Sequence, residues 1–320
     1  MQMNRLHETA STLVYDPVGP NRIATRASLH SVGFRRVELA PTLDVLSERL
    51  KLRWPDLLLV EVAGGENEVC ELVQQVRQGT LGDNPFIVII VTTWRRDGSI
   101  VGQVLNSGAD DLIARPVSAH MLGERVKALA ERRKKFVVTM DYIGPDRRRE
   151  PRGKGAECVD VPNPLNIRAT PNLSEEAGDR QIGAAIRRGK EALDAQKTRR
   201  DAVQLCLQWR MLEQRVPGAR DFREILPRIN RLAFGMMQRL GDAEAREYCN
   251  AVGRSVDGLI ALVDKAGRDA SAIDCRPMLH GLGQSAMALG RMFAPDEVEP
   301  GRLVELDMIM ASRHAPPEAA

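Results

Sequence analysis

Short aliphatic runs alternate with amphipathic stretches over the first 135 residues of this 320-residue chain. The runs TLVY, LLLVEV, FIVIIV and DLIA are rich in valine, isoleucine and leucine and show almost no alternation with polar residues. Such runs are typical of strands buried on both faces of a parallel sheet. The stretches between them, among them ELVQQV and MLGERVKALA, have the spacing of surface helices. The pattern therefore predicts an α/β layer sandwich.

In the last third of the chain the apolar positions recur with the period of an α-helix. Four sets of residues each share one helical face: Ala202, Leu205, Cys206, Trp209, Leu212 and Val216; Ile229, Leu232, Ala233, Met236, Met237 and Leu240; Val252, Val256, Leu259, Ile260 and Val263; and Leu279, Leu282, Ala286, Leu289 and Phe293. They predict an all-α helical domain of four or five antiparallel helices. Asp221, with Glu224 three residues later, also has the spacing of a capping box.

The stretch between these two regions is rich in proline, glycine and arginine and poor in apolar residues, as linkers are. Its first residues, Phe136 to Met140, form a strand-like apolar run that predicts an ordered arm, either adding an edge strand or pinned back on the α/β domain. The predicted organisation is a tail at 1–10, an α/β domain at 11–135, a linker arm at 136–183, a helical domain at 184–314 and a tail at 315–320.

Composition narrows the class of protein. Hydrophobic residues make up 43% and charged residues 28% of the chain, as in ordinary globular proteins, which excludes a chain disordered throughout. Aromatic residues are only 4%, which argues against a nucleic-acid platform built on stacked rings. The five cysteines are scattered and never form a CxxC pair, so neither a disulfide framework nor a zinc site is predicted. No apolar signal segment or membrane-length run is present, and we expect a cytoplasmic protein.

One charge cluster stands out against a net charge of only +3. Residues 125–149 contain nine lysines and arginines but three acidic residues. No helix-turn-helix pattern and no interleaved aromatic residues accompany them, so nucleic-acid binding is not expected. We interpret the cluster as a solvated helix end and linker, or as a docking strip for an acidic partner.

Three pieces of the first half carry a family resemblance. They are a strand followed by Asp16, the segment PDLLLVEV that contains Glu61, and FIVIIVTT followed by NSGADDLIARPV. Together they resemble the receiver domain of two-component response regulators over residues 11–130. The resemblance implies a flavodoxin-like, doubly wound, five-stranded parallel sheet with its site at the carboxyl ends of the strands.

A receiver accepts a phosphoryl group from a histidine kinase on an aspartate, with an acidic pair for Mg²⁺, a hydroxyl and a lysine around it. Carried over by the resemblance, the acidic pair falls on Asp16 and Pro17, the acceptor on Glu61, the hydroxyl on Thr93 and the lysine on Arg115. The small residue after the hydroxyl is Trp94, and the aromatic switch position is Leu112.

These departures change the expected chemistry. Pro17 offers no side-chain oxygen, so a Mg²⁺ site at Asp16 should be weak. Glu61 is one methylene longer than aspartate, and the guanidinium of Arg115 can clamp its carboxylate. We predict a pseudo-receiver with a permanent ion pair between Glu61 and Arg115. In the alternative, the site has decayed and Glu61 is a solvated carboxylate at a strand end.

Two further motifs leave alternatives open. Arg148 and Arg152 have the spacing of the RxxxR signature of cyclic-di-GMP-binding PilZ domains. The residues that follow have a helical pattern, whereas a PilZ domain would form the strands of a β-barrel there. The segment LHGLGQSAMALG around His280 resembles a histidine phosphotransfer motif, with Gly283 at the position of its lysine. The alternative interpretation of the chain is therefore a phosphotransfer protein that uses His280 or Glu61.

The sequence as a whole indicates an atypical response-regulator-like protein of phosphorelay signalling. We expect it to act through protein contacts, with signalling partners such as a histidine kinase or another regulator, and as a possible homodimer. No catalytic set of an enzyme is visible, and no cofactor is implied beyond the weak Mg²⁺ site. Neither the pathway nor the role of the helical half follows from the residues.

Overall fold

The computed structural model describes residues 8–62, 65–95, 97–139, 142–148, 158–299 and 301. Its contacts divide the chain into two compact units, Met1–Leu193 and Asp194–Ala320. The two units are described separately below.

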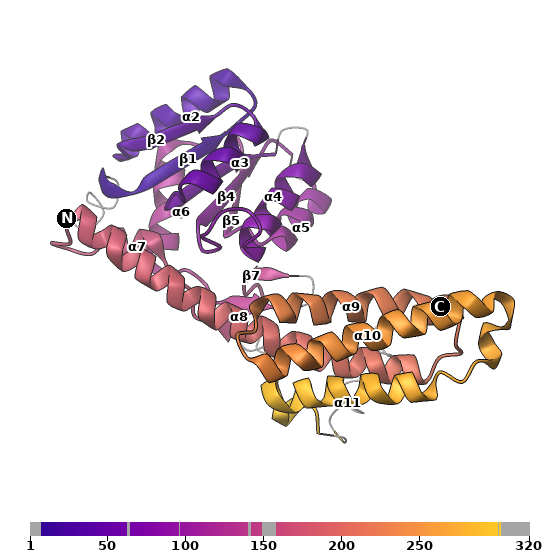
Figure 1. The fold of residues 1–320 in the computed structure, drawn as a ribbon. Coiled ribbons are helices and arrows are strands. Elements are labelled where there is room, and N and C mark those ends of the chain that lie inside the picture. Colours follow the sequence, from indigo (N-terminus) through magenta and orange to yellow (C-terminus); the bar gives the residue numbers. More distant parts are fainter. Residues whose placement is uncertain are drawn as a thin grey trace. The chain divides into compact units, whose positions relative to one another are not determined.

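The first unit is built on a five-stranded parallel sheet with the strand order β2-β1-β3-β4-β5 (Figure 1). The strands are β1 (Ser11–Tyr15), β2 (Arg36–Ala40), β3 (Leu57–Glu61), β4 (Val88–Thr93) and β5 (Asp111–Ala114). Every residue of β3 and β4 is buried, as the continuous apolar runs predicted. The predicted flavodoxin-like, doubly wound sheet is confirmed.

Five helices cover this sheet: α2 (Gly19–Val32), α3 (Leu43–Leu52), α4 (Glu66–Gln78), α5 (Gly98–Ser107) and α6 (Ala119–Glu131). Two apolar clusters lie on its opposite faces. Leu29 of α2 and Val126 of α6 belong to one cluster, while Leu46 of α3, Val73 of α4 and Val104 of α5 belong to the other. The layers therefore bury both faces of the parallel sheet, as this class of fold requires.

The segment after α6 is part of the first unit. It forms a small antiparallel sheet of order β7-β6-β8, from β6 (Phe136–Val138), β7 (Ile143–Pro145) and β8 (Cys158–Val159), and then α7 (Pro164–Arg168). Phe136, Val138 and Leu165 are buried. The apolar run predicted to be ordered forms its own sheet rather than an edge strand. The unit extends through this segment to Leu193, past the boundary predicted at residue 135.

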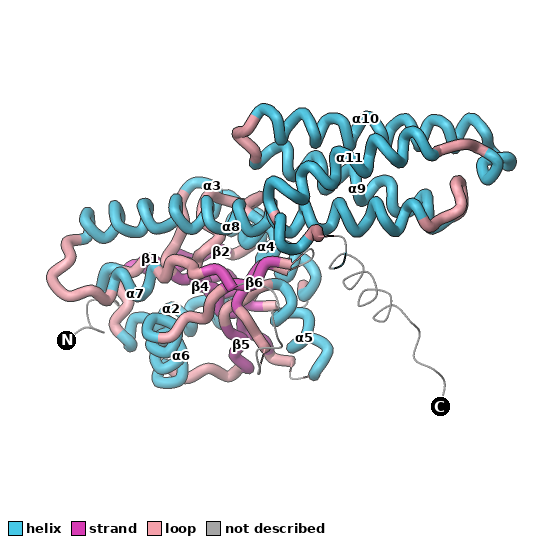
Figure 2. Tube along the Cα trace, turned by 90° about the horizontal axis from the view of Figure 1, so that it is seen from below, coloured by secondary structure: helices cyan, strands magenta, loops and turns pink. Residues whose placement is uncertain are grey.

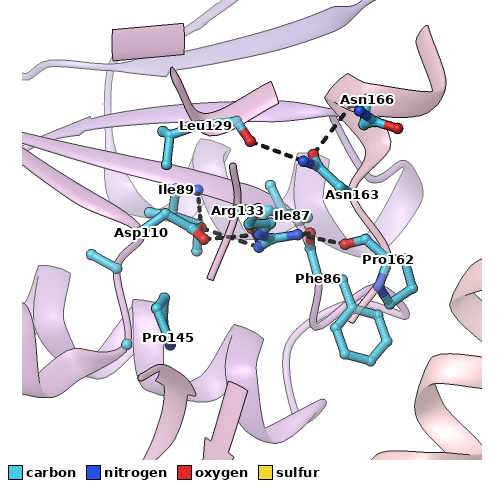
Figure 3. Close-up of polar contacts among 12 residues, drawn as sticks. Phe86, Ile87, Ile89, Asp110, Leu129, Arg133, Pro145, Pro162, Asn163 and Asn166 are labelled. Carbon is cyan, nitrogen blue, oxygen red and sulfur yellow. Dashed lines mark hydrogen bonds and ion pairs between the residues drawn. The ribbon is translucent and has the colours of Figure 1, made fainter. Parts of the chain in front are cut away.

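A buried carboxylate, Asp110, holds this segment in place (Figure 3). Asp110 accepts from the guanidinium of Arg77 on α4 at 2.7 Å and from that of Arg133, just after α6, at 2.9 Å. The backbone N–H of Ile89 donates to the same carboxylate at 2.8 Å. Burial alone would raise the pKa of Asp110, but Arg133 and Arg77 together hold it below its ordinary value. Burial lowers the pKa of Arg77 to about 10.

Arg133 also reaches backbone carbonyls on two segments. Its guanidinium donates to the oxygen of Phe86 at 2.6 Å and to that of Pro162 at 2.7 Å, which joins the start of β4 to the strand segment before α7 (Figure 3). The guanidinium carbons of Arg133 and Arg77 each lie 5.1 Å from the ring centroid of Phe136, within the range of cation–π attraction. The arm therefore covers the two guanidinium groups with Phe136 and supplies a hydrogen-bond acceptor to Arg133.

A second buried ion pair fixes the end of this segment. Arg168 of α7 donates to Asp56, just before β3, at 3.0 Å and to Asp179 at 2.6 Å. The backbone N–H and hydroxyl of Ser11 also donate to Asp56. Asp179 lies in the first turns of α8 (Glu175–Glu213). The arm is thus tied to the amino-terminal ends of the strands at two places.

Most cations of the basic stretch 125–149 are engaged within the chain. Arg133 is buried, and the other engaged side chains are Arg125 with Asp111, Lys135 with Asp160, Arg147 with the carbonyls of Leu105 and Ala109, and Arg148 with Asp146. The interpretation of this stretch as solvated is therefore wrong for Arg133, whose side chain is buried. Arg125, Lys135 and Arg148 form their ion pairs with exposed side chains, as a solvated helix end and linker would.

The second unit contains the end of α8 followed by α9 (Arg220–Arg239), α10 (Ala243–Ala266) and α11 (Arg276–Phe293), as Figure 2 shows. One apolar core joins all four helices, and Leu205, Ile229, Val256 and Leu289 belong to it. The predicted helix-rich second half is confirmed, although α8 begins at Glu175, ahead of the boundary predicted at residue 184.

Two details of the helical prediction are corrected. The helix α9 begins at Arg220 after the N-cap residue Ala219, so Asp221 lies inside its first turn and does not form the predicted capping box. Val216 lies beyond the end of α8 and is exposed. Within the described ranges no helix is both long enough and apolar enough to cross a membrane.

The buried cluster at Asp110 leads to a stability prediction. Replacing Arg133 with alanine leaves Asp110 with one cation fewer and removes a donor from the backbone carbonyls of Phe86, Ile87 and Pro162, so we expect the free energy of unfolding to fall by about 3 kcal/mol. Urea denaturation of the full chain measures this. The matched control Lys135→Ala breaks an exposed pair with Asp160 and should change stability by about 0.5 kcal/mol or less. Equal effects of the two substitutions would contradict the role given to Arg133.

Candidate functional site

Three predicted site residues come together at the carboxyl ends of the parallel strands. Asp16 directly follows β1, Glu61 is the last residue of β3, and Arg115 directly follows β5. Because β1, β3 and β5 run in the same direction, their last residues meet at one edge of the sheet. Arg115 is 8% exposed, Glu61 1% and Asp16 0%. The site is therefore an enclosed charge cluster rather than an open cleft of solvated carboxylates.

Arg115 bridges the two carboxylates. Its Nε donates to Oε2 of Glu61 at 2.5 Å, and its Nη2 donates to Oδ2 of Asp16 at 3.1 Å. The same Nη2 donates to the hydroxyl of Thr25 on α2 at 3.1 Å. The ion pair predicted between Glu61 and Arg115 is thus present, and the alternative of a solvated Glu61 is wrong.

The hydroxyl at Glu61 comes from Thr92 and not from Thr93. Thr92 donates to Oε2 of Glu61 at 2.6 Å, whereas the hydroxyl of Thr93 accepts from the backbone N–H of Arg95. Glu61 pairs with Thr92 in the register of β3 and β4, and side chains alternate between the faces of a strand, so Thr93 points to the other side. The assignment of the hydroxyl to Thr93 is corrected.

Sequence reasoning missed Thr92 and Thr25. A count of residues back from Gly108 favoured Thr93, because the relation between neighbouring strands is not visible in the chain itself. Thr25 lies on α2, and no spacing in the sequence connects it with β5. Only the packing of that helix on the sheet brings its hydroxyl to Arg115.

Burial dominates the ionisation of both carboxyl groups. It raises the pKa of Glu61, although the hydrogen bonds from Thr92 and Arg115 act in the opposite direction. It also raises the pKa of Asp16 against the hydrogen bond from the backbone N–H of Val18 and the charge of Arg115. The Oε1 atom of Glu61 is buried and has no hydrogen-bond partner, which makes its ionised form more costly. One guanidinium does not fully offset two buried carboxylates.

The oxygens of Asp16 are already engaged. Oδ1 accepts from the backbone N–H of Val18 at 2.8 Å, and Oδ2 accepts from Arg115. Pro17, which follows, has no side-chain oxygen. In the part of the chain that the structure describes, no group of three or more histidine, cysteine or acidic side chains is arranged to hold a metal ion. A divalent ion at Asp16 would have to displace a guanidinium.

A small cavity of about 50 Å³ adjoins Arg115 on the α2 and α6 side of the sheet. The residues that line it are Ala24, Thr25, Ser28, Leu59, Thr92, Arg115, Val117 and Leu122. Its volume suffices for a few water molecules.

Two further positions named by the resemblance lie outside this cavity. Trp94, which follows β4, is 52% exposed. Leu112, at the predicted switch position, packs against the apolar cluster under α3, α4 and α5.

The other predicted residues lie elsewhere. His280 is exposed on α11 in the second unit, with its Nε2 3.0 Å from Nε2 of Gln284. Gly283, one turn from His280, faces the indole of Trp209 so closely that a side chain would not fit. Arg148 pairs with Asp146 at 2.9 Å, and Arg152 lies outside the described residues. Arg148 therefore belongs to a local ion pair in the arm and not to the charged residues around Glu61.

Comparison with known proteins bears on the first unit. No protein-family model and no curated protein matches the sequence. A response regulator from Thermotoga maritima is 26% identical and covers 39% of this chain and 100% of its own, with a TM-score of 0.35. A CheY-like receiver domain from Methanospirillum hungatei is 23% identical and covers 38% of this chain and 92% of its own, with a TM-score of 0.34. A receiver domain from Bermanella marisrubri is 20% identical, with coverages of 38% and 98% and a TM-score of 0.34.

The strand order, the parallel register and the charged residues at the strand ends define the class of the first unit. It has a flavodoxin-like fold and resembles the receiver domains of response regulators. The resemblance covers somewhat more than a third of the chain.

The raised pKa of Glu61 gives a pH-dependent prediction. An isosteric Glu61→Gln variant keeps an oxygen for Arg115 and Thr92 but cannot ionise. Below the ordinary pKa of 4.5 the two proteins should differ little through charge. Above it the wild type must ionise a buried group, so the variant should gain stability relative to the wild type as the pH rises. Thermal melting of both proteins between pH 4 and pH 8 measures the difference. A variant that loses stability relative to the wild type as the pH rises would contradict the prediction.

Proposed function

We propose that this chain is an atypical response-regulator-like signalling protein whose receiver-like unit does not carry out ordinary phosphoacceptor chemistry and acts through protein contacts. The observation that carries the proposal is the buried guanidinium of Arg115 between Glu61 and Asp16. A permanent cation there pairs with both strand-end carboxylates without phosphate or metal.

The charges of the site support this proposal. In a working receiver, as the resemblance implies, Mg²⁺ and a lysine offset the charge of the acceptor aspartate and its phosphoryl group. Here Arg115 contacts both carboxylates at once, and its planar fork allows two directed bonds that a lysine cannot form. The residues present fit Mg²⁺ poorly, since each carboxylate oxygen of Asp16 already accepts a hydrogen bond and Pro17 supplies no oxygen. We therefore propose that the unit needs no cofactor.

The accessibility of Glu61 points the same way. Its Oε2 accepts from both Arg115 and Thr92, and the side chain is 1% exposed. An attacking carboxylate oxygen must approach the phosphorus of a donor. Oε2 could do so only by breaking its two hydrogen bonds, and Oε1, which has no partner among the described residues, is buried. Glu61 therefore serves as the fixed anion of an ion pair, and the protein is not an enzyme of the phosphotransfer type.

The remaining functional expectations follow from this proposal. Signalling proteins such as a histidine kinase or another regulator are the proposed partners, and a second copy of the chain is another. The five cysteines are all free, which fits the proposed location in a reducing cytoplasm. Phosphotransfer through His280 is the second candidate, favoured by the exposure of that side chain on α11. Cyclic-di-GMP binding has less support because Arg148 is held by Asp146.

A phosphodonor experiment tests the proposal. The full chain is incubated with acetyl phosphate and Mg²⁺, and intact mass is measured. We expect no added phosphoryl group on the wild type, because Glu61 is held by Arg115. A variant that combines Pro17→Asp, Glu61→Asp and Arg115→Lys restores the set that the resemblance implies and should gain the mass of one phosphoryl group. Its matched control carries Glu61→Asn with the other two changes and should gain none. Labelling of wild-type Glu61 would contradict the proposal.

Magnesium should distinguish the same proteins without any phosphodonor. In the wild type Mg²⁺ would have to compete with Arg115 and the backbone N–H of Val18 for the oxygens of Asp16, so it should leave the melting temperature unchanged. In the triple variant three aspartates, at positions 16, 17 and 61, face a lysine, and binding of Mg²⁺ to the folded state should raise the melting temperature by mass action. Differential scanning calorimetry with and without MgCl₂ measures this. Stabilisation of the wild type by Mg²⁺ that is lost in Asp16→Asn would show that the site does hold the ion.

A further inference from the structure

One solvent-facing stripe of α9 does not fit the pattern of the helix that carries it. The apolar residues of α9 point into the core of the second unit, among them Phe222, Ile229 and Met236. On such an amphipathic helix the opposite face should be polar. Instead, Phe234 is 59% exposed on that face.

The residues around Phe234 supply positive charge. Arg231 precedes it by three residues and Arg228 by six, and both are exposed. Neither arginine has an ion-pair or hydrogen-bond partner within the described ranges, whereas Arg220 and Arg223 of the same helix pair with Glu224 and Asp264. The stripe thus presents two available guanidinium groups and one aromatic ring on a rigid helix.

We propose that the stripe Arg228, Arg231 and Phe234 is a docking surface for an acidic segment of a partner protein. Guanidinium groups form directed, bidentate bonds with carboxylates, and an exposed phenyl ring gains free energy when an apolar side chain covers it. Arginine and large aromatic residues are also the types that carry most of the binding free energy at protein interfaces. The partner segment therefore carries aspartate or glutamate together with at least one large apolar side chain.

The charge of the stripe supports this occupant over a second copy of the same surface. Two unpaired arginines on each copy would repel each other across a twofold axis. Nucleic acid is a poorer fit, because the patch has only two available cations, and phosphate backbones are usually bound by larger clusters. The surface deepens the proposed function, since it gives the helical unit a means of protein contact.

A peptide titration tests the proposal. The probe is a fluorescein-labelled helical peptide of glutamate and leucine, and its matched counterpart has every glutamate replaced by lysine. The full-length protein is titrated into each while fluorescence anisotropy is recorded. We expect binding of the glutamate peptide only. Phe234→Ala and Arg231→Ala should each weaken it by about tenfold or more.

Matched controls separate this surface from general charge and hydrophobicity. Met292→Ala removes another exposed apolar side chain, 42% exposed on α11, and Arg246→Ala removes an exposed positive charge from α10. Both should leave the affinity unchanged. The double variant Arg228→Glu with Arg231→Glu should lose the glutamate peptide and gain the lysine peptide. Circular dichroism establishes that each variant is folded.

Several outcomes would overturn the inference. They are no binding of the glutamate peptide, binding that the α9 substitutions do not change, and tighter binding of single-stranded DNA or of phosphatidylserine vesicles through the same residues. The phosphodonor experiment reports on Glu61 and Arg115 in the first unit. Its result does not affect the peptide titration, so failure of one proposal is distinguishable from failure of the other.

Discussion

The first unit depends on one buried carboxylate that faces two guanidinium groups. Asp110 stands at the start of β5, and it receives Arg77 from α4 and Arg133 from the end of α6. Buried guanidinium groups need both an anion and enough acceptors, and the backbone carbonyls of β4 and of the arm supply the rest. The ring of Phe136 then covers both cations. The residues after α6 are therefore part of this unit's core and cannot be treated as a tether.

The opposite edge of the same sheet has the inverse arrangement. There one guanidinium, Arg115, faces two buried carboxylates, Asp16 and Glu61. The pKa shifts follow these ratios: two cations keep the pKa of Asp110 low, whereas a single shared cation leaves the pKa of Asp16 and Glu61 raised by burial. The charges around Asp110 thus form a structural cluster in which the anion is fully paired, whereas the cluster around Arg115 has one more anion than cation. An imbalance of this kind is common at functional sites.

Much of the architecture could be predicted because it depends on local patterns. Continuous apolar runs indicated buried strands, and helical periodicity indicated the second unit. The resemblance to receiver domains, which assigns Glu61 and Arg115 to one site, implied their ion pair. The hydroxyl at Glu61 could not be predicted in the same way. Thr92 and Thr93 are adjacent in sequence, and only the register between β3 and β4 decides which of them points at the carboxylate.

The sequence by itself determined the strands and helices, and it placed Pro17, Glu61 and Arg115 at the ends of strands, where the resemblance to receivers locates the site. Tertiary structure alone decided what the charged residues do. The buried side chain of Arg133 could not be told from its exposed neighbours in the basic stretch, because sequence shows the charge of each residue but not its burial or its partners. Long-range packing placed Arg133 beside Asp110 and left Arg231 beside an exposed Phe234. Burial and pairing depend on contacts between distant segments, so they become visible only in the folded chain.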